Sequence, residues 1–134
     1  MIPAGFLGTG SCVRIISVNV NGLRSAAKKG FFAWLDACGA DVVCLQEVRA
    51  TAAQVAELPG QPQGWHFHLL EAEKAGYSGV AIYSRAAPTE VLTGFNLPEF
   101  DAEGRVIEAR FPGLRVISAY LPSGSSGPER QAAK

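Results

Sequence analysis

The sequence has few cysteines, and none of them forms a recognisable pair. Only three occur in 134 residues, Cys12, Cys38 and Cys44. An odd number cannot be paired completely in disulfides, and no spacing matches a structural metal site. Cys38 and Cys44 stand among apolar residues, so we interpret both as small side chains of the core. This scarcity excludes a disulfide-stabilised secreted scaffold and predicts a cytoplasmic protein.

The sequence also lacks an excess of one charge and a long hydrophobic run. Its 12 Lys and Arg residues balance its 12 Asp and Glu residues. This balance argues against a domain that binds nucleic acid through bulk positive charge, but it allows a local basic patch. No apolar stretch approaches the ~20 residues of a membrane helix, so we predict no membrane contact. Residues 1–12 are Gly-rich without the basic start of a signal peptide, and we interpret them as a disordered leader.

What the sequence does contain is a pair of apolar runs, each with polar side chains at its end. Residues 13–20 are nearly all apolar, which predicts a strand covered on both faces. Residues 41–45 predict a second strand. Between them, residues 25–38 place apolar side chains at helical spacing and predict one helix, which Gly39 ends. A strand, helix and strand in this order predict two parallel strands whose C-terminal ends share one edge of a sheet.

That shared edge would bring Asn19, Asn21 and Glu47 together, because they stand at the ends of these two strands. One carboxylate beside carboxamides, completed by water and phosphate oxygens, suits Mg²⁺. Glu47 is then the metal ligand, and Arg24 faces a phosphate. The alternatives remain open: Glu47 is a solvated carboxylate at a helix start, and Arg24 with Lys28 and Lys29 forms a solvated helix face.

The remainder of the chain predicts short elements of one domain without a linker. Their expected ranges are a helix over 51–58, strands over 65–70 and 80–84, a hairpin of 105–111 with 114–120, and a helix that begins at 129. His66 and His68 fall on one face of a strand, and we interpret them as partly buried strand residues rather than a metal pair.

Five short motifs occur in a recognisable order. They are residues 19–24 (NVNGLR), 45–47 (LQE), 76–80 (GYSGV), 101–105 (DAEGR) and 119–122 (AYLP). Together they resemble the exonuclease III family of abasic-site (AP) endonucleases, within the endonuclease/exonuclease/phosphatase superfamily. The resemblance runs from about residue 13 to the last residue.

The resemblance implies an α/β fold, a four-layer α/β/β/α sandwich of the endonuclease/exonuclease/phosphatase type. Members are about twice as long, so residues 13–134 would be the N-terminal half of a single domain. We expect such a chain to supply about one sheet with its helices. One sheet face would then lack its partner and leave a large apolar surface exposed.

The resemblance also implies roles for individual residues. Glu47 would bind Mg²⁺, for which Mn²⁺ can substitute; Asn19 would hydrogen-bond within the catalytic cluster beside the metal, with Asn21 nearby. Tyr120 would reach the scissile phosphate. The residues expected to contact DNA are Arg24, Lys28, Lys29, Tyr77, Arg105 and Ser123. Ser123 stands where many members carry Asn or Gln.

Three of these residues also have plain structural interpretations. Tyr77 is then a turn aromatic that covers the edge of the core, and Tyr120 packs at a strand end. Arg105 would pair with Asp101 or Glu103 in a weak surface contact.

The implied activity is Mg²⁺-assisted hydrolysis of double-stranded DNA 5′ to abasic sites and at 3′ ends. Relatives complete the site with a Gly-Asp-x-Asn segment and a Ser-Asp-His segment, and neither occurs in these 134 residues. We therefore expect a truncated chain that is inactive alone, with no obligate protein partner evident. The alternatives are another superfamily enzyme, such as a phosphoinositide phosphatase or sphingomyelin phosphodiesterase, and a non-catalytic DNA-binding fragment.

Overall fold

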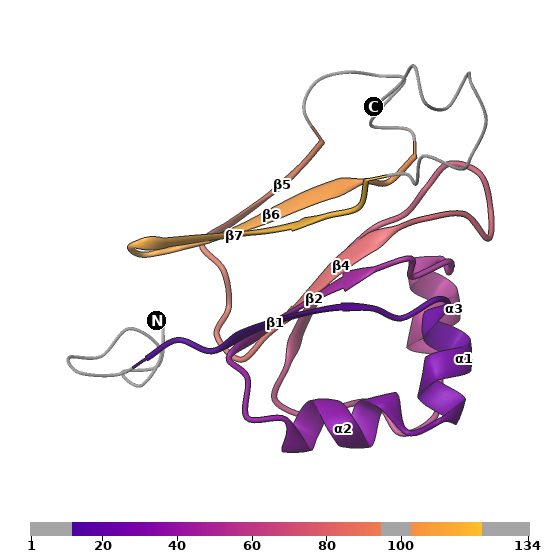
Figure 1. Cartoon of the computed structure of the whole chain (residues 1–134), viewed down its shortest axis with the longest axis horizontal. Helices are drawn as coiled ribbons and strands as arrows, with labels where there is room; N and C mark the ends of the chain where they lie inside the picture. The colour runs from indigo at the N-terminus through magenta and orange to yellow at the C-terminus, as the bar shows by residue number, and fades with distance from the viewer. Residues whose placement is uncertain (1–11, 95–102, 122–134) are drawn as a thin grey trace.

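Two β-sheets pack face to face, and helices cover the outer side of one of them (Figure 1). The structure is a computed structural model that describes residues 12–94 and 103–121. Its elements are β1 (Ile15–Asn19), α1 (Leu23–Lys28), α2 (Phe31–Ala37), β2 (Val42–Gln46), α3 (Ala52–Ala56), β3 (His66–Leu70), β4 (Val80–Ser84), β5 (Glu90–Thr93), β6 (Val106–Phe111) and β7 (Leu114–Ala119). The strand orders are β1-β2-β4-β3 and β5-β6-β7. None of the described helices is long and apolar enough to cross a membrane.

The first strands and helices follow the predicted unit, with one difference. β1 and β2 are parallel, with Ile15 opposite Val42. The single helix predicted over 25–38 is wrong, because the chain forms α1 and α2 separately. Gly30 lies between them in the left-handed region (φ 98°), which ends one helix and starts the next in a new direction. Gly39, also with positive φ, follows α2 as predicted.

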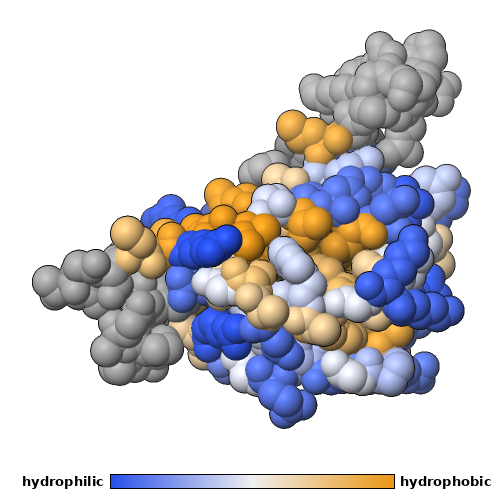
Figure 2. Space-filling model, turned by 60° about the horizontal axis from the view of Figure 1, so that its bottom comes forward, coloured by the Kyte–Doolittle hydropathy of each residue, from blue (hydrophilic) through white to orange (hydrophobic). Residues whose placement is uncertain are grey.

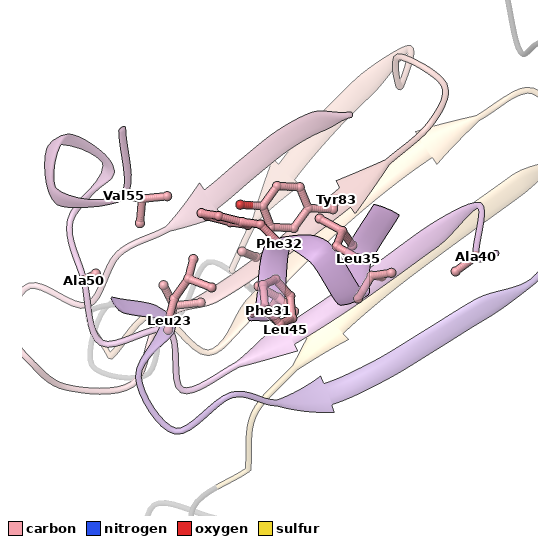
Figure 3. Close-up of a cluster of buried hydrophobic side chains, with 12 residues drawn as sticks. Leu23, Phe31, Phe32, Leu35, Ala40, Leu45, Ala50, Val55 and Tyr83 are labelled. Carbon is pink, nitrogen blue, oxygen red and sulfur yellow. The ribbon is translucent and has the colours of Figure 1, made fainter. Parts of the chain in front are cut away.

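One core lies between the helices and the four-stranded sheet (Figure 3). Leu23 of α1 and Leu35 of α2 are completely buried there, against Leu45 of β2. The ring of Tyr83 on β4 lies in the same core, with its centroid 4.5 Å from that of Phe67 on β3. This packing fixes the helices on β2 and β4, and so fixes where the loops after β1 and β2 emerge.

A second core lies between the two sheets and corrects a prediction. Val42 and Cys44 of β2 and Ile82 of β4 pack there against Ile107 and Phe111 of β6. The chain thus supplies strands of both sheets, and the expectation of about one sheet with a bare face is wrong. The reason is that the β6–β7 hairpin folds back over β2 and β4. Cys44 is 3% exposed, which confirms it as a core side chain, and this burial raises the pKa of its thiol to about 11.

The prediction that the first strand is covered on both faces is also wrong. β1 is the last strand of its sheet, and its residues alternate between exposed and half-buried. Ile16 and Val18 point toward the helices, whereas Ile15 on the opposite face is 45% exposed. The second sheet lies over β2 and β4 and leaves this face of β1 uncovered among the described residues.

Most of the remaining predicted elements are present. The short helix over 51–58 occurs as α3, with Thr51 as its N-cap in a capping box with Gln54. The strands at 65–70 and 80–84 and the hairpin around Pro112 are confirmed. β5 was not predicted; it adds an antiparallel strand beside β6. Residues 1–11 of the predicted leader, Ser123 and the helix predicted from 129 lie outside the described residues.

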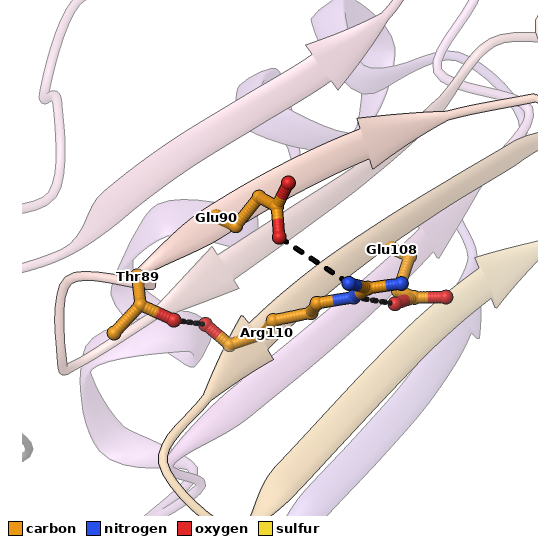
Figure 4. Close-up of polar contacts among 4 residues, drawn as sticks. All are labelled: Thr89, Glu90, Glu108 and Arg110. Carbon is orange, nitrogen blue, oxygen red and sulfur yellow. Dashed lines mark hydrogen bonds and ion pairs between the residues drawn. The ribbon is translucent and has the colours of Figure 1, made fainter.

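On the outer face of the second sheet, charged side chains of β5 and β6 form neighbouring ion pairs (Figure 4). Arg110 of β6 pairs with Glu108 on its own strand and with Glu90 of β5, at 3.3 Å. The carbonyl of Arg110 also accepts a hydrogen bond from the hydroxyl of Thr89 (3.0 Å). These contacts hold β5 in register with β6 at the end of the sheet away from the loops that follow β1 and β2.

Candidate functional site

Three loops meet where β1 and β2 end and β4 begins. The amide of Gly22, after β1, donates to the carbonyl of Glu47, after β2 (2.8 Å). The amides of Val48 and Arg49 donate to the carbonyls of Gly79 (3.0 Å) and Ser78 (2.8 Å), just before β4. Each loop is thus bonded to a neighbour through its main chain. The side chains of these loops are held at fixed positions relative to one another.

The backbone of these loops is unusual. Within the described parts of the chain, the residues with positive φ that are not glycine are Asn21 (46°), Glu47 (52°), Arg49 (53°) and Ser78 (33°). All of them fall in the three loops. Non-glycine residues adopt this region rarely, at a cost of order 1–3 kcal/mol each, and they concentrate at functional sites. The hydrogen bonds between the loops hold these residues in that conformation.

The centre of the site is the contact between Asn19 and Glu47, which the sequence predicted to lie together. The amide Nδ2 of Asn19 donates a hydrogen bond to Oε2 of the Glu47 carboxylate. Oδ1 of Asn19 accepts from the main-chain amide of Asn21 (3.0 Å), which fixes the orientation of the Asn19 side chain. The guanidinium of Arg49 pairs with the other carboxylate oxygen, Oε1.

These partners keep Glu47 ionised although its side chain is only 15% exposed. The hydrogen bond from Asn19 is the largest influence and lowers the pKa of Glu47 below 4.5. Burial opposes this shift, and the hydrogen bond and charge of Arg49 reinforce it. The Glu47 carboxylate is therefore negatively charged at neutral pH.

The donor set fits a hard divalent cation. Each Glu47 oxygen accepts one hydrogen bond and keeps further lone pairs for a metal. Among residues 12–94 and 103–121, no group of three His, Cys, Asp or Glu side chains surrounds a common point. One carboxylate with a neighbouring carboxamide is nevertheless a usual protein contribution to Mg²⁺, which keeps waters and binds phosphate oxygens. Arg49 is 45% exposed and has room to move aside.

A basic pocket opens beside this centre. It has a volume of about 420 Å³ and is lined by Gly22, Arg24, Ser25, Lys28, Arg49 and Gly76. The pocket holds three cationic side chains. The guanidinium of Arg24 donates to the main-chain carbonyl of Arg49 (3.1 Å), which ties Arg24 to the loop that carries Arg49. Lys29 does not line this pocket; with Asn21 it lines a second, more apolar pocket on the other side of α1. A pocket with three cations next to a carboxylate is suited to phosphate groups.

The predicted aromatic residues lie at the border of the site. Tyr77 is 47% exposed and follows Gly76 of the basic pocket, with Nζ of Lys74 lying 4.2 Å from its ring centroid. Tyr120 follows β7 and is partly buried against the core between the sheets. Its position over the end of β2 follows from the hydrogen bond between Gln46 and Ser118 (3.3 Å).

Arg105 does not lie with the basic residues. Its side chain is 1% exposed and pairs with Glu103, which is 37% exposed, so the cation itself lies inside the protein rather than on the surface. The carbonyl of Arg105 accepts from the amide of Tyr120 (2.8 Å). In this structure Arg105 holds the start of β6 and the end of β7 together.

Sequence reasoning missed Arg49 and Ser118. Arg49 stands two residues after Glu47, and that spacing is the signal that could have indicated a contact with the carboxylate. Ser118 is buried between the sheets, where its hydroxyl donates to the carbonyl of Leu45 (2.9 Å). The sequence gave no sign of this bond, because a serine in a strand of alternating residues does not indicate which distant residue it will contact.

Known proteins are similar to this chain in sequence and in architecture. The sequence profile of the Endonuclease/Exonuclease/phosphatase family matches residues 16–134. An exodeoxyribonuclease of Bacillus subtilis is 40% identical over 119 residues, covering 88% of this chain and 46% of the relative. The DNA repair nuclease APEX1 of Danio rerio is 39% identical, covering 90% of this chain and 39% of the relative.

A solved structure agrees with these relatives. The AP endonuclease LMAP from Leishmania major matches with a TM-score of 0.72 and 29% identity, covering 90% of this chain and 43% of that chain. The fold is therefore mixed α/β with two sheets, and it corresponds to about half of these larger structures. The chain spans less than half the length of the curated relatives it matches.

Proposed function

Because the chain belongs to the Endonuclease/Exonuclease/phosphatase family, we propose that it forms the metal-holding half of a Mg²⁺-dependent DNA repair nuclease. This enzyme would hydrolyse phosphodiesters 5′ to abasic sites and at 3′ ends of double-stranded DNA. The observation that carries the proposal is the Asn19–Glu47 contact beside a pocket lined by three cations. The relationship to exodeoxyribonucleases and AP endonucleases supports DNA over lipid phosphates as the substrate.

Glu47 would hold Mg²⁺, or Mn²⁺ in its place, with Asn19 beside it. When bound, the ion supplies positive charge to a phosphate whose negative charge grows during hydrolysis. Asn19 keeps the carboxylate ionised and correctly turned, because its own amide is fixed by Asn21. Without the ion, the guanidinium of Arg49 neutralises the Glu47 carboxylate. Because the Arg49 side chain is 45% exposed, it could turn toward a phosphate oxygen when the ion is bound.

The basic pocket would hold the DNA backbone without reading its sequence. Arg24 and Lys28 are placed to contact phosphates, Tyr77 borders them, and Lys29 extends the positive surface. Tyr120 would approach the scissile phosphate from the end of β7. Abasic sites would be favoured over normal ones because a nucleotide without a base costs little to extrude. Ser123 lies outside the described residues, and its contact with DNA stays a prediction.

Arg105 takes a different role from the one that the resemblance implied. Its guanidinium is buried and its main-chain carbonyl accepts from the amide of Tyr120, so we assign Arg105 to positioning Tyr120 rather than to binding DNA. The described residues place no group of three His, Cys, Asp or Glu side chains around a common point at Glu47. The groups that activate the water would therefore come from the part of the fold outside them.

Metal and DNA binding can be tested separately from activity. Mn²⁺ binding, followed by its electron paramagnetic resonance signal, should weaken at least tenfold in Glu47→Gln and stay unchanged in Glu57→Gln, an exposed glutamate after α3.

Binding of an abasic duplex, followed by fluorescence anisotropy, should weaken at least tenfold in the Arg24→Ala/Lys28→Ala double variant. Arg115→Ala, an exposed arginine on β7, is the matched control.

Three results would contradict the proposal. The first is Mn²⁺ binding that Glu47→Gln leaves intact. The second is equal binding of the chain to abasic DNA and to phosphoinositide vesicles, which would favour a lipid phosphatase of the same family. Salt-dependent binding of DNA without any Mn²⁺ site would indicate a non-catalytic DNA-binding fragment.

A further inference from the structure

The loop between β3 and β4, residues 71–79, lies at the same end of the molecule as α1 and α3 (Figure 1). Gly76 of this loop lines the basic pocket. Figure 2, in which this end is again on the right, shows mostly hydrophilic surface there, with hydrophobic residues nearer the middle. The ring of Tyr77, the next residue, is nevertheless 47% exposed. The loop thus holds an exposed aromatic ring directly after a residue of the basic pocket.

The side chain of Lys74 lies over this ring. Its Nζ is 4.2 Å from the ring centroid of Tyr77, a distance at which a cation is attracted by the face of the ring. The amide of Tyr77 also donates to the carbonyl of Lys74 (3.2 Å), which closes a turn between the two residues. Lys74 is exposed and forms no ion pair within the described parts of the chain, although Glu73 precedes it. Its positive charge is therefore held over the ring without a carboxylate partner.

Both ends of the loop are fixed. At its start, the carboxylate of Glu71 accepts from the amide of Ala52, the first residue of α3 (2.8 Å), and Gly104 closely approaches the main chain of residues 71 and 72. At its end, main-chain hydrogen bonds join the loop to the residues that follow β2. The ring of Tyr77 is thus carried by a fixed segment. A free lysine side chain loses rotamer freedom when it contacts a ligand, and one that already lies over a ring loses less.

A second contact between a cation and a ring shows what a structural pair looks like in this fold. Arg85, which follows β4, lies 3.9 Å from the ring centroid of Trp65. Trp65 packs against the core beneath the helices and donates to the carboxylate of Asp36 in α2 (3.0 Å). Neither Lys74 nor Tyr77 belongs to the cores formed by the described residues, so packing does not require their contact.

We propose that Lys74 is a further phosphate-contacting residue of the nuclease, and that the ring of Tyr77 positions its ammonium group for this contact. Lys74 would add a fourth cation to the three that line the basic pocket. It would bind a phosphate of the DNA backbone and would not read the base sequence. The inference rests on the proposed function and gives Tyr77 a task that does not require its own contact with DNA.

The test measures binding of an abasic duplex to this chain by fluorescence anisotropy over a range of salt concentrations. Lys74→Met keeps an unbranched side chain that packs on a ring but removes the charge. It should weaken binding about fivefold and lower the slope of log affinity against log salt by about one. Lys74→Arg keeps the charge and also stacks on aromatic rings, so it should restore both values.

Arg85→Met is the matched control. It also removes one positive charge from the face of a ring, but at the other end of β4. It should therefore leave the affinity for the duplex and the salt slope unchanged. Circular dichroism of the Lys74 variants should match that of the unchanged chain, because the side chain is exposed.

A second measurement tests the role of the ring. In a Tyr77→Leu background, Lys74→Met should weaken DNA binding by less than about twofold, because the ammonium group is no longer positioned. Without DNA, the ring current of Tyr77 should shift the ε-proton NMR signals of Lys74 upfield. Tyr77→Leu should abolish this shift, and Arg85→Met should not.

Four results would overturn the inference and leave the proposed function intact. The first is an unchanged salt slope in Lys74→Met, even with weaker binding, which would give Lys74 a structural role only. The second is an equal effect of Lys74→Met with and without the ring, and the third is the absence of the upfield shift. The fourth is an equal loss of binding in Arg85→Met, which would assign the effect to the net charge of the chain. Failure of the unchanged chain to bind the duplex at all would instead contradict the proposed function, and this inference with it.

Discussion

The hydroxyl of Ser118 on β7 donates a hydrogen bond to the carbonyl of Leu45 on β2, over 2.9 Å and across the space between the two sheets. The side chain of Gln46 donates to the same hydroxyl (3.3 Å) and to that of Ser17 on β1 (3.0 Å). These bonds set the C-terminal end of β7 above the ends of β1 and β2. Tyr120, two residues beyond Ser118, therefore depends on this polar link for its place beside the core between the sheets.

Replacing Ser118 by alanine should destabilise the protein and disturb that alignment. The lost hydroxyl leaves a buried carbonyl with one partner fewer, which costs about 1–2 kcal/mol of the free energy of unfolding. Urea denaturation measures this difference. Ser17→Ala is the matched control, because Ser17 is exposed and its loss should cost less than about 0.5 kcal/mol. Equal effects of the two substitutions would contradict a special role for the link between the sheets.

Asn19 should control the ionisation of Glu47. Its hydrogen bond is the main reason that the pKa of Glu47 lies below 4.5, so Asn19→Ala should raise that pKa toward the ordinary value. Carbon-detected NMR of the Glu47 carboxyl during a pH titration measures the shift. Asn21→Gly is the control, since it keeps the main-chain amide that bonds to Asn19 and suits the positive φ.

The same shift fixes the direction of a pH dependence. A carboxyl whose pKa is lowered by folding stabilises the folded state at pH above its unfolded value, and this contribution is lost as the pH falls through the lowered folded value. The stability of the unchanged chain should therefore fall on acidification to below pH 4.5, and this part of the fall should be smaller in Asn19→Ala. An identical pH profile for the two proteins would contradict the assigned cause.

Much of the first half of the fold could be predicted, because its signals are local. The run that contains Val18, the apolar helix positions and the order of strand, helix and strand together require a parallel pair whose ends meet. That order is sufficient to predict that Asn19 lies beside Glu47. The break at Gly30 was missed because a glycine within a helical pattern is tolerated often enough to give no clear signal.

What could not be predicted depends on contacts that are distant in sequence. The burial of Arg105 follows from the packing of its loop against the segment around Ala72, and the bond of Ser118 to Leu45 spans 73 residues. Arg105 is charged and stands in a loop-like motif, so sequence alone favoured a surface position. Only the fold shows that its guanidinium is enclosed.

Arg105 and Arg24 should respond differently to substitution. Arg105→Met removes a buried cation from its pair with Glu103 and should cost more than about 2 kcal/mol of the free energy of unfolding. Arg24→Met should change stability by less than about 0.5 kcal/mol, because Arg24 is exposed, but should weaken DNA binding. Denaturation and anisotropy measure the two effects. Loss of DNA binding without loss of stability in Arg105→Met would return Arg105 to the DNA-contacting residues.

Gly104 should tolerate no side chain. A Cβ built there would lie 2.7 Å from the main-chain nitrogen of Ala72 and 2.9 Å from the carbonyl carbon of Glu71, both of which are rigid backbone atoms. Gly60 is the matched control, because it also has a positive φ (75°, against 62° for Gly104) but no atom within 4 Å of a new Cβ. Gly60→Ala should cost about 1 kcal/mol, the strain of a left-handed alanine alone.

Gly104→Ala should cost at least about 2 kcal/mol more than this control, since the loop before β6 must move away from residues 71 and 72. The movement would shift Arg105, whose carbonyl holds the amide of Tyr120, and so would reach the candidate site. The difference between the two unfolding free energies isolates the close approach from the positive φ. Equal costs would show that the contact between the two loops is not required for stability.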